Sequence, residues 1–378
     1  MKILSYMLMC IFVLSYCSQA AESGLADCNK VDRDIENRIA YQEEGKFCGW
    51  PANEGVWNWG NEILVGFEIS SFVKNAKGHS IDRNSPKYIY FARSLDGGES
   101  WKVEKPKEIL PPLYMEDPEM FKFGENKNSY LKEPMNFANP GFAMKLRANR
   151  FYYSYDKGKS WKGPYLLPDF GQKLIMARTD YVVLGPKKCI AFISSSQTDG
   201  HYGESFGILT EDGGLSWEKK ALVDTEFPPK EYKKWAYSIM PSTVMLDNGD
   251  LVTTLRQRGD RGIWIDAFVS KDKGNSWSKL GKVCERAKNP PSLVKLEDGR
   301  LCIVYCYRVD KPYGLRAKIS EDNGKSWGDE IILRDDAKSW DIGYVRSVQR
   351  PDGKVVSMYY YHTQGNPEQH IAVTIWQP

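Results

Sequence analysis

An octet of the form [ST]-x-D-x-G-x-S-W occurs five times in this chain, and this repeat constrains the fold more than any other feature. The copies are "SLDGGESW", "SYDKGKSW", "TEDGGLSW", "SKDKGNSW" and "SEDNGKSW", beginning at residues 94, 154, 210, 270 and 320, so successive copies start 60, 56, 60 and 50 residues apart. A period of this size, with short β-type segments between the copies, indicates a repeated sheet unit such as the blade of a propeller.

Strand signals fill the intervals between the octets. Segments rich in Val, Ile, Tyr and Phe, bounded by Gly, Asp, Asn and Pro, predict strands at 62–70, 87–94, 143–154, 301–307 and 355–361. In "PSTVMLDNGDLVTTL" and "PSLVKLEDGRLCIVY", an Asn-Gly or Asp-Gly turn joins two strands in a hairpin. One strand then leads into the octet and another follows it, so each unit has four antiparallel strands.

The repeat count predicts six units. Five octets mark five of them, and the segment after Trp340 supplies three further strands at 344–349, 355–361 and 371–376. The N-terminal stretch "RIAYQEEGKF" can add the missing fourth strand, which closes the ring and removes exposed sheet edges. We therefore predict an all-β fold, a six-bladed β-propeller of four-stranded antiparallel blades, as one domain over residues 21–378. A closed ring needs no partner to cover its edges, so we expect a monomer.

Residues 1–20 have the pattern of an export signal. Lys2 is followed by an apolar stretch, and Ser18-Gln19-Ala20 provides small residues at the cleavage position. The apolar stretch is too short to span a bilayer, so no transmembrane segment is expected. A second interpretation treats Leu14-Ser15-Tyr16-Cys17 as a lipobox, which would leave a lipid anchor on Cys17. Both interpretations predict a secreted or periplasmic protein, or a lipoprotein on the cell surface.

Charge and cysteines exclude several classes of function. The formal net charge is +3, which provides no electrostatic footprint for nucleic acid. Among the cysteines after residue 20, only Cys28 and Cys48 form a plausible local disulfide, and buried free thiols are the other interpretation. The sequence has no C-x-x-C pair or His cluster with metal-ligand spacing, so we expect no bound zinc and no cofactor.

The octets themselves are predicted to be structural. Each Asp can accept backbone N–H bonds within a tight turn, the Gly two residues later supplies a positive φ, and the Trp buries a large apolar area. Five near-identical copies around a ring cannot all face one site. The five aspartates are Asp96, Asp156, Asp212, Asp272 and Asp322.

The octets resemble the Asp-boxes, also called BNR repeats, of the bacterial sialidase superfamily, whose members are six-bladed propellers. The segments "GWPANEGVWNWGNEILVGF", "ARTDY", "IMPSTV" and "GYVRSVQRPDGKVV" resemble the same superfamily. This resemblance covers essentially the mature chain and implies an exported glycoside hydrolase that removes a terminal acidic or otherwise decorated sugar from a glycan. Because a fold does not determine a function, the site has to be argued separately.

Polar side chains gather at the strand ends opposite the octets, which predicts a funnel there. An arginine fork binds a carboxylate bidentately, so the predicted substrate-binding residues are Arg178, Arg256, Arg308, Arg316 and Arg346. The predicted acid, base or nucleophile candidates are Asp180, Tyr344, Glu54 and Asp266.

The resemblance also implies specific roles, and the sequence departs from two of them. Sialidases use a tyrosine nucleophile activated by a glutamate, together with arginines that hold the substrate carboxylate. Arg256 and Arg316 match the second and third of these arginines, and Tyr344 lies near the tyrosine. The Arg-Ile-Pro motif of the superfamily reads Gly49-Trp50-Pro51, and the glutamate position falls at Met240. Two alternatives therefore stay open: a non-catalytic glycan-binding propeller, and a polysaccharide lyase with a Tyr or His base.

Overall fold

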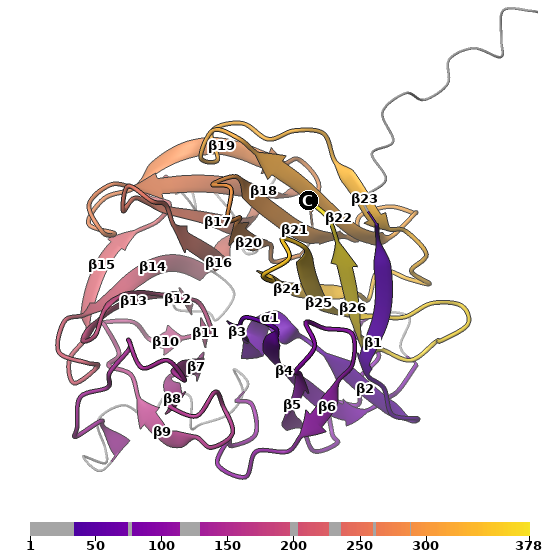
Figure 1. Cartoon of the computed structure of the whole chain (residues 1–378), viewed down its shortest axis with the longest axis horizontal. Helices are drawn as coiled ribbons and strands as arrows, with labels where there is room; N and C mark the ends of the chain where they lie inside the picture. The colour runs from indigo at the N-terminus through magenta and orange to yellow at the C-terminus, as the bar shows by residue number, and fades with distance from the viewer. Residues whose placement is uncertain are drawn as a thin grey trace, which may run out of the picture. The chain divides into compact units, whose positions relative to one another are not determined.

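Each octet joins the third strand of a blade to the fourth in the computed structural model of this chain (Figure 1). In the first octet, Oδ1 of Asp96 accepts hydrogen bonds from the Ser100 N–H at 2.9 Å and from the Ser94 hydroxyl at 2.8 Å. The Ser94 hydroxyl accepts the Gly98 N–H at 2.7 Å. The same contacts recur around Asp156, Asp212, Asp272 and Asp322. The structural interpretation of the octets is therefore confirmed.

The structure describes residues 34–74, 78–113, 129–196, 203–226, 236–259, 262–287 and 289–378. The predicted export signal, the lipobox cysteine Cys17 and Cys28 lie outside these ranges. Contacts divide the chain after Asp34, and all the blades belong to the unit Ile35–Pro378. Within the described ranges no helix has the length and apolar character needed to cross a membrane. The cysteines in these ranges are free thiols: Cys48, Cys189, Cys284, Cys302 and Cys306.

Blades 5 and 6 are regular four-stranded antiparallel sheets, and blade 4 has the same strand order but joins blade 3 in one nine-stranded sheet through a parallel pairing of Gly203 with Tyr237. Blade 4 contains β16 (Tyr237–Met245), β17 (Leu251–Gly259), β18 (Gly262–Ser270) and β19 (Ser278–Cys284). Blade 5 contains β20 (Ser292–Lys295), β21 (Leu301–Tyr307), β22 (Gly314–Ser320) and β23 (Ile331–Arg334). Blade 6 contains β24 (Gly343–Gln349), β25 (Val355–Tyr361), β26 (His370–Trp376) and β1 (Glu36–Tyr41).

Blades 1 to 3 have interrupted inner strands. In blade 1 the inner strand is divided into β2 (Lys46–Gly49) and β3 (Val56–Trp59) by helix α1 (Pro51–Glu54). Both parts pair with β4 (Glu62–Ser71). The blade continues with β5 (Tyr88–Ser94) and β6 (Lys102–Glu104). In blade 2, β11 (Ala177–Arg178) is the strand at the inner edge, and it is followed in the sheet by β7 (Ala143–Ala148), β8 (Arg150–Ser154) and β9 (Lys162–Leu166). In blade 3, β10 (Leu174–Ile175) and β12 (Tyr181–Gly185) both pair with β13 (Lys188–Ser196), followed by β14 (Gly203–Thr210) and β15 (Glu218–Leu222).

One predicted strand is wrong. Residues 143–154, expected as one strand, form the hairpin of β7 and β8, in which Arg147 pairs with Arg150. Ala148 takes φ 54° at the turn, and Asn149 beside it is buried. The turn contains no Gly or Pro, so the continuous apolar pattern concealed it; Asn is one of the residues that such a turn tolerates.

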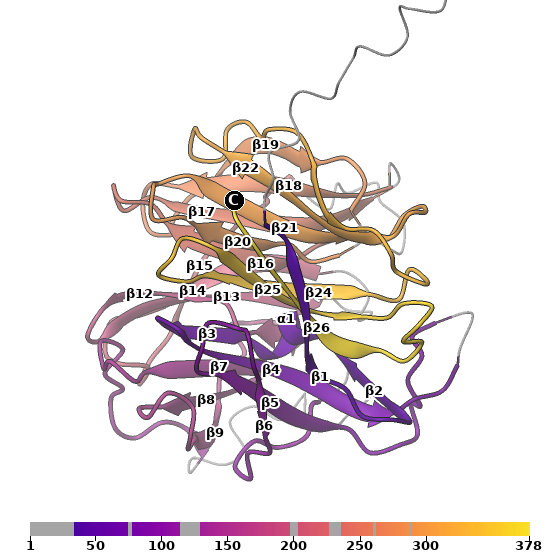
Figure 2. The same ribbon diagram turned by 45° about the vertical axis from the view of Figure 1, so that its right-hand side comes forward.

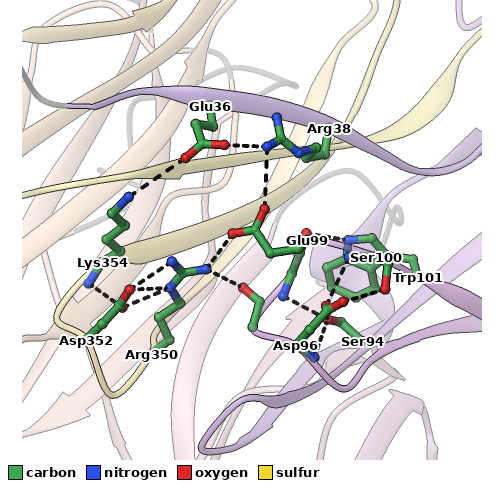
Figure 3. Close-up of polar contacts among 12 residues, drawn as sticks. Glu36, Arg38, Ser94, Asp96, Glu99, Ser100, Trp101, Arg350, Asp352 and Lys354 are labelled. Atoms are coloured by element: carbon green, nitrogen blue, oxygen red, sulfur yellow. Dashed lines mark hydrogen bonds and ion pairs between the residues drawn. The ribbon is translucent and has the colours of Figure 1, made fainter.

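The N-terminal strand completes blade 6, as predicted. β1 lies along β26, and Glu36 pairs with Ile375 (Figures 1 and 2). Figure 3 shows polar contacts that reinforce this seam between blades 6 and 1. Nη1 of Arg350, at the end of β24, pairs with Glu99 at 3.0 Å and donates to the Gly97 carbonyl at 3.1 Å, both in the first octet. The ring is therefore closed by backbone pairing and by an octet together.

Neighbouring blades are joined by aromatic packing at the octets and by hydrogen bonds near the axis. The Trp161 ring of the blade 2 octet lies 5.4 Å from Phe91 of blade 1. Closer to the axis, the Ser242 hydroxyl of blade 4 accepts the Leu293 N–H of blade 5 at 2.8 Å. The Ser292 hydroxyl of blade 5 accepts the Ser347 N–H of blade 6, also at 2.8 Å. In blades 4 and 5, one serine side chain of the inner strand thus holds the inner strand of the next blade in place.

Candidate functional site

Three residues with left-handed backbone lie at or beside the inner strands. Trp50 has φ 59°, Met240 φ 59° and Tyr344 φ 52°, values that are uncommon for residues other than glycine. The β-ladder is interrupted at two of them, between Ile239 and Ser242 and between Gly343 and Arg346. Bulges of this kind change the direction of a side chain and are frequent beside active sites. This backbone determines where Met240 and Tyr344 point.

The Tyr344 phenol lies among three guanidinium groups. Burial alone would raise its pKa, but the positive charges of Arg256, Arg178 and Arg308, with a hydrogen bond from Arg256, lower the pKa below its ordinary value. A phenol with a lowered pKa reaches its nucleophilic or basic phenolate form more readily. The structure therefore brings together four of the residues that the sequence predicts for the site.

Arg178 is held by residues of α1 and β4. Its Nε donates to Oδ1 of Asn53 at 2.8 Å, and Nδ2 of Asn53 donates to Glu68 at 3.2 Å. Glu68 also pairs with Arg147 at 2.9 Å. Burial lowers the pKa of Arg178 to about 10, so it keeps its positive charge at neutral pH. The interruption of the blade 1 inner strand by α1 thus positions one of the arginines beside Tyr344.

Arg308 is positioned by a buried amide that also contacts the tyrosine backbone. Its Nη1 donates to Oδ1 of Asn289 at 2.9 Å and to the Ile342 carbonyl at 3.0 Å. The same Asn289 oxygen accepts the Tyr344 N–H at 3.4 Å. A Cβ on Gly343 would lie 2.3 Å from that oxygen, so only glycine fits beside it.

A pocket of about 300 Å³ adjoins this cluster. It is lined by Arg256, Arg258, Ile263, Arg308, Val309, Tyr313 and Trp340. The guanidinium of Arg308 lies 5.0 Å from the centre of the Trp340 ring, and that of Arg256 lies 5.0 Å from the centre of the Tyr237 ring. Within the described residues, Nε of Arg256 and Nε of Arg308 are buried without a hydrogen-bond partner. Buried donors of this kind are normally satisfied, so these two nitrogens indicate a site for an anionic or oxygen-rich ligand.

Three of the predicted site residues instead have structural contacts. Glu54 is fully buried and pairs with Lys145 and, at 3.4 Å, with Arg147; burial would raise the pKa of Glu54, but these two charges lower it. Asp266 is buried against Nε1 of Trp264 at 2.8 Å and Lys279 at 2.6 Å. These contacts engage one oxygen of Asp266 and hold Glu54 by ion pairs, while Oδ1 of Asp266 and Oε1 of Glu54 are buried without a hydrogen-bond partner among the described residues.

Arg316 is the third predicted site residue that has structural contacts instead. It is 3% exposed and donates to the carbonyls of Arg334 at 2.7 Å and Pro312 at 3.2 Å. A strand-end arginine can bind either a ligand or nearby loop carbonyls, and here the carbonyls hold it.

Asp180 and Arg346 line a second cavity, of about 320 Å³, along the middle of the inner strands. Asp180 accepts the Thr243 N–H at 3.3 Å and its hydroxyl at 2.9 Å, so it occupies the place that Ser242 and Ser292 hold in the next two blades. Burial raises the pKa of Asp180 to about 6, although the charge of Arg346 opposes this rise. Arg346 donates to the Thr179 carbonyl at 2.8 Å. Asp180 therefore joins two neighbouring blades, and Arg346 links blade 6 to the segment that precedes Asp180.

The sequence reasoning missed the amides and aromatic residues that organise the arginines. Asn53, Asn289 and Trp340 were not predicted for the site. Asn53 falls in the short segment "PANE", and Asn289 precedes two prolines, so both stand at breaks in the strand pattern where polar residues can reach a site. In the part of the chain that the structure describes, no group of three or more His, Cys, Asp or Glu residues is arranged to hold a metal ion.

Comparisons with known proteins support the fold assignment. The sequence profile of the BNR repeat-like domain matches residues 134–356, more than half of the chain. A protein of unknown function from Dyadobacter fermentans has a similar structure, with TM-score 0.64 and 21% identity, covering 91% of this chain and 99% of that one. No curated protein sequence matches this chain.

Two glycan-active enzymes are similar at lower identity. A NanB sialidase mutant from Streptococcus pneumoniae has TM-score 0.54 and 13% identity, covering 90% of this chain and 70% of that one. An α-L-arabinanase from Penicillium chrysogenum, complexed with arabinobiose, has TM-score 0.53 and 14% identity, covering 90% of this chain and 98% of that one. At these identities the likeness concerns the fold, which is one on which glycoside hydrolases are built.

Proposed function

Since this chain belongs to the family of proteins with a BNR repeat-like domain, we propose that it is a glycoside hydrolase that removes a terminal acidic sugar from a glycan. Sialic acid is the first candidate for that sugar. The observation that carries the proposal is the position of the Tyr344 phenol among three arginines. Two of the arginines that line the adjoining pocket, Arg256 and Arg308, each have a buried guanidinium nitrogen without a hydrogen-bond partner among the described residues.

In the proposed reaction, the arginine pocket binds the acid group of the sugar. Arg256 and Arg308 present donors to a carboxylate, and the Trp340 ring packs beneath the Arg308 guanidinium. This arrangement orients the anomeric carbon toward Oη of Tyr344, which forms a covalent bond to that carbon as the leaving group departs. Water then hydrolyses the glycosyl-tyrosine.

Activation of the tyrosine would follow a different route from that of the sialidases that this chain resembles. Met240 stands where a glutamate base is expected, and a thioether cannot accept the phenol proton. Here the surrounding positive charge lowers the pKa of Tyr344 instead. Activation by a lowered pKa and activation by a neighbouring base are equivalent ways of supplying a nucleophile.

Mass spectrometry of released sugars tests this proposal. The protein, the variant Tyr344→Phe and the control Tyr88→Phe are incubated with sialylated, uronic-acid-bearing and neutral glycans; Tyr88 is 51% exposed and lies on β5. We expect release of one acidic sugar by the protein and by Tyr88→Phe, and a loss of about a hundredfold or more in Tyr344→Phe. Binding without release would make the site a lectin site, and release unaffected by Tyr344→Phe would contradict the assignment.

A polysaccharide lyase is a second candidate that the same geometry favours. A phenol of lowered pKa can remove the proton next to a carboxylate whose charge is neutralised by arginines, and elimination then breaks the glycosidic bond. The product is unsaturated and absorbs in the near ultraviolet, so absorbance of the uronic-acid reactions separates the two chemistries. We also propose that the protein is exported, which the distribution of the native protein between cell and medium would test.

A further inference from the structure

A buried aspartate in the loop before Tyr344 holds a histidine from blade 1. Asp341 has a side chain that is only 3% exposed, and its Oδ1 lies 2.5 Å from Nδ1 of His79. The same carboxylate accepts the Ser80 N–H at 2.9 Å, the Tyr360 hydroxyl at 3.0 Å and Nε2 of Gln369 at 3.0 Å. Four donors therefore fix the position of this carboxylate.

The His79 ring borders the candidate site on two sides. Its centre lies 5.4 Å from that of the Trp50 ring, edge to face, and 5.5 Å from that of the Trp340 ring. The centres of the Trp50 and Tyr344 rings are 6.5 Å apart, and Trp340 lines the arginine pocket. The Trp50 indole thus lies beside both His79 and Tyr344. The second indole beside His79, that of Trp340, lines the arginine pocket.

The orientation of the imidazole is suited to proton transfer. A carboxylate at Nδ1 keeps that nitrogen protonated, so Nε2 is the atom that can exchange a proton with a ligand. The His79 side chain is 29% exposed, and no contact within the described ranges engages Nε2. Burial would raise the pKa of Asp341, but His79, the Ser80 N–H and the charge of Arg308 lower it, so the carboxylate stays ionised.

We propose that His79, oriented by Asp341, is the proton donor and acceptor of this site. The inference rests on the proposed hydrolase function and deepens it, because it names the group that protonates the leaving sugar. None of the carboxylates predicted for the acid role adjoins Tyr344: Glu54 and Asp266 have other partners, and Asp180 lines the second cavity.

Protons balance over the two steps of the reaction. The reaction starts with His79 as the imidazolium, protonated at both ring nitrogens, and with Tyr344 as the phenolate. In the first step, Nε2 of His79 gives its proton to the glycosidic oxygen while the bond from that oxygen to the anomeric carbon breaks and the phenolate oxygen of Tyr344 bonds to the same carbon. In the second step, Nε2 takes a proton from water as the water oxygen bonds to the anomeric carbon and the tyrosine leaves. Both side chains return to their starting states.

Dependence on the leaving group distinguishes a proton donor from a structural residue. A natural glycoside needs protonation of its leaving oxygen, whereas an aryl glycoside with a nitrophenol leaving group does not. For His79→Asn we expect cleavage of the natural glycan to fall by about 10²- to 10⁴-fold and formation of the glycosyl-tyrosine from the aryl glycoside to be nearly unchanged. Azide, which needs no base, should restore turnover of the aryl glycoside and give a glycosyl azide.

The matched control is His362→Asn. His362 is buried and contacts the Ser339 hydroxyl and the Pro367 carbonyl, so its loss tests the general effect of removing a histidine from this region. We expect both substrates to be cleaved at nearly the rate of the unmodified protein. His79→Gln is the second variant if His79→Asn does not fold, as judged by its thermal unfolding.

Each outcome decides one of the two proposals. If the unmodified protein cleaves its glycan and His79→Asn does so equally well, or loses both substrates equally without azide rescue, the role of His79 is overturned and the hydrolase proposal stands. If the unmodified protein cleaves neither substrate, the hydrolase proposal fails and the role of His79 fails with it. Selective loss on the natural glycan with azide rescue supports both.

Discussion

The sulfur of Met240 lies 3.9 Å from Nη1 of Arg256, with the Met240 side chain only 3% exposed. A soft, uncharged thioether therefore contacts one of the arginines whose charge lowers the pKa of Tyr344. Because it carries no negative charge, it leaves the field of Arg256 available to the phenol. The identity of residue 240 thus controls the electrostatics of the tyrosine indirectly, through the arginine.

Met240→Glu should raise the pKa of Tyr344. A carboxylate at this position would pair with Arg256 and offset its charge, so the phenol would lose part of the stabilisation of its ionised form. Because the phenolate is the reactive form, we expect the limb of the pH–activity profile that follows the ionisation of Tyr344 to move to higher pH, and the absorbance change of its phenol to occur at higher pH. Met240→Gln is the neutral control of similar size and should shift neither; an equal shift in both variants would show that polarity, rather than charge, is responsible.

Asp180→Asn should remove a pH dependence of stability. The pKa of Asp180 rises from 3.8 to about 6 on folding, so its contribution to stability is complete below pH 3.8 and is lost as pH rises toward 6. The shift of about two units corresponds to about 3 kcal/mol. Denaturant unfolding at pH 4 and pH 7 should show the protein losing most of that amount relative to Asp180→Asn. A constant difference between the two proteins would contradict the raised pKa.

Glu54→Gln should destabilise the protein strongly. Glu54 and Lys145 are both fully buried, and the variant would leave the lysine charge without its main partner. Removing one member of such a pair costs about 3–5 kcal/mol. Glu211→Gln breaks an exposed pair with Lys188 and is the matched control, for which urea unfolding should show no measurable change. A small loss in Glu54→Gln would show that the Glu68 carboxylate compensates for the lost negative charge.

Asp322→Ala should weaken the fold without affecting turnover of substrate. Asp322 accepts the Ser326 N–H at 2.8 Å and contacts the hydroxyls of Ser320 and Ser326, so the variant opens the turn between β22 and β23. We expect a loss of about 1–2 kcal/mol in the free energy of unfolding. The neighbouring exposed residue provides the control, Glu321→Ala. A fall in kcat with no change in the free energy of unfolding would instead show that this octet takes part in catalysis.

Local signals made most of the fold predictable. The boundaries of β21 and β25 match their predicted ranges, because both are apolar strands that end at an Asp-Gly turn or a polar loop. The Asp-boxes are self-contained hydrogen-bonded turns, so their structure depends on residues that are adjacent in sequence. The hairpin of β7 and β8 was missed because its turn at Ala148 and Asn149 depends on tertiary packing.

The site was predictable only in part. The resemblance at Arg256 and around Tyr344 indicated the centre of the cluster. They could not separate Arg308, which Asn289 aims toward Tyr344, from Arg316, which the Arg334 and Pro312 carbonyls hold. Both arginines belong to blade 5, and the difference arises from loop carbonyls and a buried amide that no sequence pattern reports.

The pairing of β1 with β26 ties the order of folding to the order of synthesis. β1 is the first strand of the ring to be made, and its partner is the last. The five intervening blades can assemble as the chain emerges, but the final joint must wait for β26. During that interval the backbone groups of β1 are free to pair with another chain. A ring that hides its edges once closed is therefore most prone to aggregation at the last moment of its production.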